Sequence, residues 1–189
     1  MIPAGYMAKK VCPRPASLKA KNVVDIYSVS NCVNDDFDDY IQFWEHNDYW
    51  FFNSPADLLQ VAKTAELNLS IMSLFYYEIH SEQWDGETWK VFATQNSAST
   101  NVLKPKKTHL EGFDVVTFGQ QTNPGCSLLS CNSMAEELPT NSHCLFSTFE
   151  QAHEALTSNA FKDCEPGPYR IFAVYSTDWP AVTDSETLA

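Results

Sequence analysis

The sequence lacks any long apolar run. None of its segments approaches the ~18–20 apolar residues that a helix needs to cross a bilayer. The first residues also lack the apolar stretch of a secretory signal. The sequence therefore predicts a protein without a membrane partner and with a cytoplasmic location.

Basic residues are scarce. Twelve Lys and Arg face twenty-four Asp and Glu, so the formal net charge is −12. Because basic side chains that neutralise phosphates supply most of the affinity for nucleic acids, this composition argues against a nucleic-acid partner. A basic protein is instead attracted and steered toward so acidic a surface.

The sequence contains none of the common catalytic signatures. No G-x-S-x-G, H-E-x-x-H, P-loop or dinucleotide-binding pattern occurs. Four acids lie close together within Asp35–Asp39, but no glycine occurs between Asp35 and Asp85, and a calcium-binding EF-hand loop requires one. We therefore expect no cofactor.

The chain does contain enough apolar material for one folded core. It has 189 residues, of which 44% are hydrophobic and only 19% are charged, a composition unlike that of disordered chains. No internal repeat is visible. We predict a basic, proline-containing arm at residues 1–22, a single acidic domain at 23–180 and a frayed tail at 181–189.

Hydrophobic periodicity predicts an α+β fold. We expect a mixed, mostly antiparallel sheet of about five strands with three or four helices. The predicted strands are 23–29, 71–79, 87–92, 113–118 and 169–175. The predicted helices cover 35–46, a segment opening at Ser54, a short stripe at 131–138 and a segment opening with a Ser147–Glu150 capping box.

Six cysteines are many for a cytoplasmic chain, and we expect reduced, mostly buried thiols. A zinc site is a weaker alternative, because its ligands would be spaced more loosely than in typical sites. Cys126 follows Pro124-Gly125 where a loop is expected to enter a helix, and a helix N-terminus lowers a thiol pKa. The four candidate ligands of the zinc site are Cys126, Cys131, Cys144 and Cys164.

The segment Phe43–Phe52 most invites a functional interpretation. It is rich in aromatic residues and lies within residues 35–87, which hold twelve acids and one base, Lys63. Aromatic side chains ringed by charges are typical of binding hot spots, although such rings also fill cores. The predicted partner-binding residues are Asp35, Asp36, Asp38, Asp39, Phe43, Glu45, Asp48, Tyr49 and Trp50.

These features favour an intracellular binding module that neutralises a basic protein, as small bacterial immunity proteins and antitoxins do. Two alternatives stay open: an enzyme that uses a thiol or metal around Cys126, and a structural or regulatory subunit of a larger assembly. The basic arm has two acidic targets, its own domain and a second copy, so homo-oligomers also remain an option.

Overall fold

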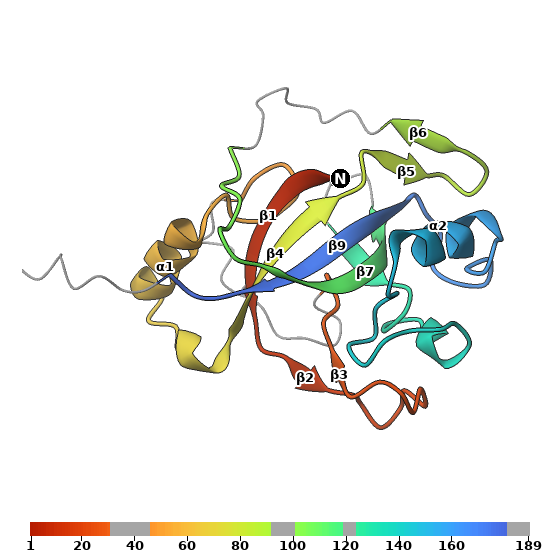
Figure 1. Ribbon diagram of the computed structural model, residues 1–189, viewed down its shortest axis with the longest axis horizontal. Coiled ribbons are helices and arrows are strands. Elements are labelled where there is room, and N and C mark those ends of the chain that lie inside the picture. Colours follow the sequence, from red (N-terminus) through yellow and green to blue (C-terminus); the bar gives the residue numbers. More distant parts are fainter. Residues whose placement is uncertain (31–45, 92–100, 119–123, 181–189) are drawn as a thin grey trace, which may run out of the picture.

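The computed structural model describes residues 1–30, 46–91, 101–118 and 124–180. These residues form an α+β domain in which a curled antiparallel sheet carries one helix near each end of the view (Figure 1). Within these ranges, no helix is long and apolar enough to span a membrane.

Four strands form the centre of the sheet. β4 (Ser73–Ile79) lies between β1 (Ile2–Lys9) and β9 (Tyr169–Thr177), and β9 pairs on its other side with β7 (His109–Phe118). All three pairings are antiparallel. The expected central strand at 169–175 is confirmed, since residues 169–174 of β9 are buried and its neighbours cover both of its edges.

Shorter strands extend this centre. β8 (Pro124–Ser127) pairs with β7, while a hairpin of β5 (Glu82–Trp84) and β6 (Trp89–Val91) joins β9 through the pair Trp84 and Tyr169. The described residues thus give the sheet seven strands, more than expected. A separate pair joins β2 (Cys12–Pro13) and β3 (Asp25–Ile26).

Two α-helices lie in the described residues, fewer than the three or four expected. Helix α1 (Pro55–Thr64) begins as predicted, with Ser54 as N-cap and proline at the first position. Helix α2 (Phe149–Thr157) has the predicted kind of cap, but Thr148 and Gln151 form the reciprocal box, one residue later than expected. Two short 3₁₀ turns cover Leu69–Ile71 and Met134–Glu136.

The order β1–α1–β4 recurs as β7–α2–β9, a structural repeat that was not recognised in the sequence. In the first unit Gly5 of β1 pairs with Tyr77 of β4, and in the second Gly112 of β7 pairs with Val174 of β9. Tyr77 and Val174 face each other across the β4–β9 ladder. A pseudo-two-fold axis through this pair therefore relates the two units.

Each unit has the same bulge in its first strand. The ladder shifts register immediately before Gly5 and Gly112, which have φ of 139° and 149°. A Cβ at Gly5 would lie 2.5 Å from the Cβ of Phe51, and one at Gly112 would lie 2.5 Å from the carbonyl oxygen of Phe146. Glycine is required at both positions by backbone angle and by close approach.

Each unit also turns into its helix in the same way. The Oδ1 of Asn47 accepts hydrogen bonds from the backbone N–H groups two and four residues later, and Asn141 does the same. Their Nδ2 groups donate to the carbonyls of the bulge residues Ala4 and Glu111, at 2.8 and 2.7 Å. One asparagine thus fixes each turn and ties it to its strand.

The expected arm at residues 1–22 is wrong for its first half, which forms β1. Residues Ala4 to Lys9 are all buried, so the side chains on both faces are covered and the strand shows no polar–apolar alternation. The expected strand at 23–29 shrinks to Asp25–Ile26, because the backbone at 28–30 bonds instead to the side chains of Lys9 and Asp114.

The expected helix at 131–138 is also wrong. Only the 3₁₀ turn Met134–Glu136 forms, because the backbone N–H groups of Met134 and Ala135 donate back to the carbonyls of Leu128 and Leu129. The predicted helix at 35–46, apart from His46, and the predicted tail at 181–189 lie outside the described residues.

Candidate functional site

The aromatic segment mainly builds the core. Tyr49, Phe51 and Phe52 are at most 3% exposed, so Tyr49 is not the surface anchor that the sequence predicted. The guanidinium of Arg170, which is itself buried, lies 5.8 Å from the Tyr49 ring. The pinned Asn47 turn explains this placement, since it turns the rings inward against β1.

The remaining predicted contact residues are only partly placed. Asp48 and Trp50 are half-buried, and Trp50 stacks on His46 with ring centroids 4.0 Å apart. The other predicted residues lie outside the described ranges: Asp35, Asp36, Asp38, Asp39, Phe43 and Glu45.

The surroundings of the cysteines differ from those that the sequence predicted. Cys126 lies in β8, where its N–H bonds to Thr117 at 2.9 Å, so it has no helix N-terminus to lower its pKa. Burial raises the pKa of Cys144 to about 12 and also raises that of Cys164. Cys131 is half-buried, and in the described ranges no three or more His, Cys, Asp and Glu are arranged to hold a metal.

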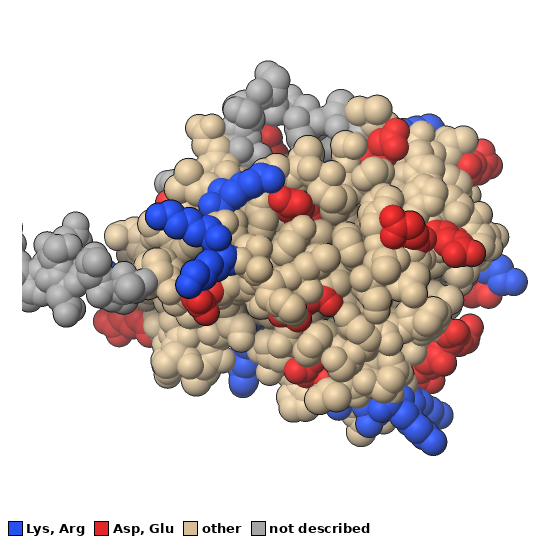
Figure 2. Space-filling view, viewed as in Figure 1, with Lys and Arg blue, Asp and Glu red and all other residues tan. Residues whose placement is uncertain are grey.

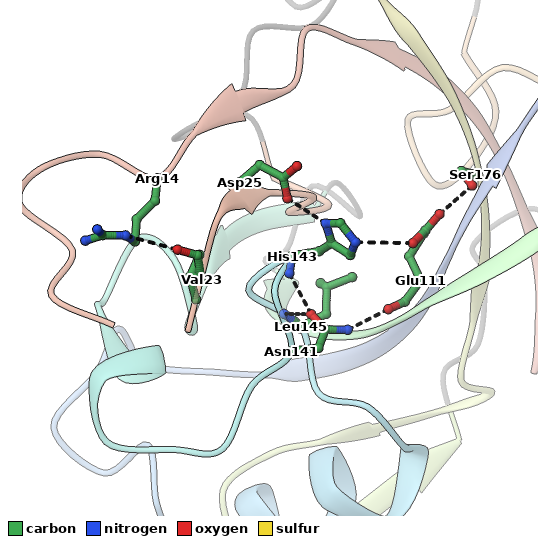
Figure 3. Close-up of polar contacts among 8 residues, drawn as sticks. All are labelled: Arg14, Val23, Asp25, Glu111, Asn141, His143, Leu145 and Ser176. Carbon is green, nitrogen blue, oxygen red and sulfur yellow. Dashed lines mark hydrogen bonds and ion pairs between the residues drawn. The ribbon is translucent and has the colours of Figure 1, made fainter. Parts of the chain in front are cut away.

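The structure instead brings His143 between two carboxylates (Figure 3). Its Nδ1 lies 2.5 Å from Oδ1 of Asp25, and its Nε2 lies 3.7 Å from Oε2 of Glu111. The other oxygen of Glu111 accepts a hydrogen bond from the Ser176 hydroxyl at 2.5 Å. The ring of Tyr27 stacks on the imidazole at 4.1 Å.

Comparison of the two units shows why this cluster is unusual. The pseudo-two-fold relates Glu111 to Ala4, His143 to Tyr49 and Ser176 to Ile79. All three counterparts are buried, at 0%, 3% and 0% exposure. The second unit thus carries polar groups where the first carries core residues, and the His143 side chain is 27% exposed.

The carboxylates of Asp25 and Glu111 give the cluster acceptor oxygens for a hydrogen-bond donor group. The imidazole is hydrogen-bonded to Asp25, whereas the 3.7 Å between its Nε2 and Glu111 exceeds hydrogen-bond distance. The cluster also attaches the Asn141 turn, which carries His143, to the segment that follows β3, since the Tyr27 N–H donates to the His143 carbonyl at 3.1 Å. Sequence reasoning missed Asp25, Glu111 and Ser176.

A second polar cluster is fully enclosed. The Lys9 ammonium donates to the carbonyls of residues 28, 29 and 30 at 3.1, 2.6 and 3.0 Å. Asp114 accepts from the Val29 N–H at 2.8 Å and from the Ser127 hydroxyl at 2.7 Å. Burial raises the pKa of Asp114 to about 6, although these hydrogen bonds and Lys9 act in the opposite direction.

The surface shows two regions of opposite charge (Figure 2). Acidic side chains gather on the side of the molecule that carries α2 and the β5–β6 hairpin, and lysines gather near α1. We define the acidic face by seven residues of these elements and the segment after α2: Glu82, Asp85, Glu87, Glu150, Glu154, Asp163 and Glu165.

A cavity of about 310 Å³ opens on the acidic face. Trp84, Leu156, Phe161 and Tyr169 provide its apolar walls, and Asp85 lies at its edge. Known proteins give no further guide, because the chain matches no family model, no curated protein and no solved structure at a significant level.

Proposed function

We propose that the protein is a binding module for a basic protein partner, and that the partner docks on the acidic face. The observation that carries the proposal is the cavity beside Trp84, which has aromatic walls and opens within the acidic face; Asp85 and Lys162 are the charged residues that line it. Such a cavity suits the side chain of an arginine or lysine. The aliphatic stem would pack on the rings, and the charged head would reach the carboxylates.

The charge of the face supports this proposal. Its elements hold seven acids, and their bases are Lys90, which already pairs with Asp85, and Lys162. Within the described ranges, Glu150 and Glu154 form no ion pair and are exposed on α2. Unpaired surface acids steer a basic partner and raise its association rate.

The elements of the face are held together by aromatic packing. Trp89 of the hairpin stacks on His153 of α2 with centroids 4.8 Å apart, and the Tyr169 hydroxyl bonds to the Glu165 carbonyl at 2.7 Å. The cavity walls are therefore ordered before binding, which lowers the entropy cost of association.

The experiment compares three baits in affinity capture from cells of the source organism, eluted with a salt gradient. The test bait carries Glu150→Gln and Glu154→Gln, and the control bait carries Asp57→Asn in α1 and Glu66→Gln just after the end of α1. The pairs match well, because each removes two exposed acids, one of them in the first turn of a helix.

We expect the wild-type and control baits to retain a basic protein that the test bait releases at lower salt. Trp84→Ala should speed dissociation of the same protein, because it removes a wall of the cavity. Elution of every captured protein at the same salt concentration from all three baits would refute the assignment of the acidic face.

A further inference from the structure

Residues Leu103–Lys107 form a strap across the sheet. The first carbonyl of the strap accepts a hydrogen bond from Tyr6 of β1. Lys104 pairs with Glu78 of β4 at 3.1 Å, and the last carbonyl of the strap accepts from Thr177 of β9 at 2.9 Å. The strap is therefore attached to three neighbouring strands, β1, β4 and β9, which places its lysines over the sheet.

Two adjoining cavities of about 470 and 440 Å³ follow the strap. They share four lining residues and so make one groove, which we call the strap groove: Lys107, Thr177, Asp178 and Trp179. The Trp179 indole is held in place, since its Nε1 donates to the Met72 carbonyl at 3.1 Å.

The two parts of the strap groove differ in chemistry. The larger part is lined by polar groups, of which the Ser176 hydroxyl already donates to Glu111: Ser73, Thr108, His109 and Ser176. The smaller part is mainly apolar, with three prolines and a leucine: Pro55, Leu103, Pro105 and Pro180. An elongated ligand with both polar and apolar groups fits this lining better than a single small ion does.

The repeat shows that a ring can occupy the apolar part. The pseudo-two-fold relates Pro55, the first residue of α1, to Phe149, the first of α2. Phe149 is covered by the His80 ring at 5.0 Å, with Trp89 behind it at 5.4 Å. The counterpart of His80 is Thr177, which is smaller and leaves the equivalent space as a cavity.

The strap groove is lined by more basic than acidic side chains, with Lys104, Lys106 and Lys107 against Asp178, which favours an acidic ligand. Three of the twelve bases of this acidic chain lie in the strap, at positions 104, 106 and 107. Lys104 is paired with Glu78, while Lys106 and Lys107 form no ion pair within the described ranges. Figure 2 shows lysine or arginine side chains gathered on the side of the molecule that carries α1.

We propose that the strap groove binds an acidic peptide segment of a partner protein. Carboxylates of the peptide meet Lys106 and Lys107 at the rim, and an apolar side chain enters the space above Pro55 and Tyr6. This site has the opposite charge to the acidic face, so it adds a second partner rather than another contact with the first.

The test measures fluorescence anisotropy of a fluorescein-labelled peptide in which glutamates flank a leucine and a phenylalanine. The variant Lys106→Gln/Lys107→Gln is compared with Lys19→Gln/Lys21→Gln, which removes two exposed lysines elsewhere. We expect the first variant to bind about three- to tenfold more weakly at low salt, and the second to stay within about twofold of wild type.

Two further readings decide whether the groove itself binds the peptide. The NMR amide signals of Thr108 and Thr177 should shift on titration, and a peptide with glycines in place of its apolar residues should bind more weakly. Equal loss in both variants, absence of binding, or equal binding of the glycine peptide would overturn the proposal. Self-association in sedimentation that only the Lys106/Lys107 variant abolishes would assign the groove to a second copy and also overturn it.

Discussion

The two units of the repeat share their backbone devices and differ in their chemistry. Both keep the bulge glycine, the asparagine turn and an N-capped helix. In the first unit Tyr49 packs in the core, whereas in the second His143 lies between two acids at the surface. The shared residues fix backbone geometry, so the fold depends on them, while the other positions are free to diverge.

The largest effects are expected at the two bulge glycines. Gly5→Ala and Gly112→Ala each combine a positive φ with a contact of 2.5 Å, and should cost about 3 kcal/mol or more of unfolding free energy. Urea titration measures this. Gly86→Ala is the control, because Gly86 also has a positive φ but open space around it, and should cost about 1 kcal/mol. If only one bulge glycine proves sensitive, the two bulges are not equivalent.

Asp114 should make the stability of the second unit depend on pH, because its counterpart in the first unit is Met7, which does not titrate. The pKa of Asp114 is raised above that of an unfolded chain to about 6, so its contribution to stability is complete below about pH 4. It is lost as the pH rises through 6, a change of about 3 kcal/mol. Asp114→Asn should remove this slope in denaturation curves from pH 4 to 8.

The control for this pH prediction is Met7→Leu, at the equivalent position of the other unit. It should change the unfolding free energy by a similar amount at every pH, since neither side chain titrates. If the unfolding free energy of Asp114→Asn still falls with pH as in the wild type, the burial of Asp114 does not cause the pH dependence.

Intermediate effects are expected at the two turn asparagines. Asn47→Ala and Asn141→Ala each remove three side-chain hydrogen bonds to backbone, which should cost about 2 kcal/mol in thermal or urea unfolding. Aspartate keeps the acceptor oxygen and loses only the donor, so it should cost less than alanine. Equal losses for aspartate and alanine would mean that the bond to the bulge carbonyl dominates.

The smallest effect is expected at His143. His143→Gln removes a partly exposed contact with Asp25 that is an ion pair only where the imidazole is protonated, so it should cost no more than about 1 kcal/mol. The loss should shrink as salt is added, because salt screens exposed charges. A larger, salt-independent loss in urea titrations would show that His143 is as deeply structural as Tyr49, its counterpart.

Local signals predicted the elements that depend on local structure. Ser54-Pro55 predicted the start of α1, and the apolar segment 169–175 predicted β9. Helix caps and buried strands can be recognised from residues that are adjacent in the sequence. β1 shows no polar–apolar alternation in its sequence, since both of its faces are covered by segments that are distant in the chain. The repeat was missed because its units share few residues. The spacing of asparagine, phenylalanine and cap is the same in Asn47, Phe52 and Ser54 as in Asn141, Phe146 and Thr148, but the bulge glycine lies at a different distance before each asparagine.

The candidate sites were less accessible to sequence reasoning. His143 lies in the Asn141 turn, Asp25 in β3 and Glu111 at the bulge of β7. These three residues are far apart in the sequence, so no local pattern indicates that they are in contact. The strap groove depends equally on distant pairs, such as Lys104 with Glu78. Charge composition did predict the acidic surface, because nearly all charged side chains must lie outside the core.

The position of β4 at the centre of the repeat affects how the chain can fold during synthesis. β1 and β4 can pair early, but the other edge of β4 stays open until β9 is made, roughly 90 residues later. At about 5–20 residues per second the ribosome needs several seconds for that length. During this time the backbone N–H and C=O groups along that edge of β4 lack the antiparallel partner that β9 later provides, so the nascent first unit exposes a strand edge of the kind that pairs with other chains.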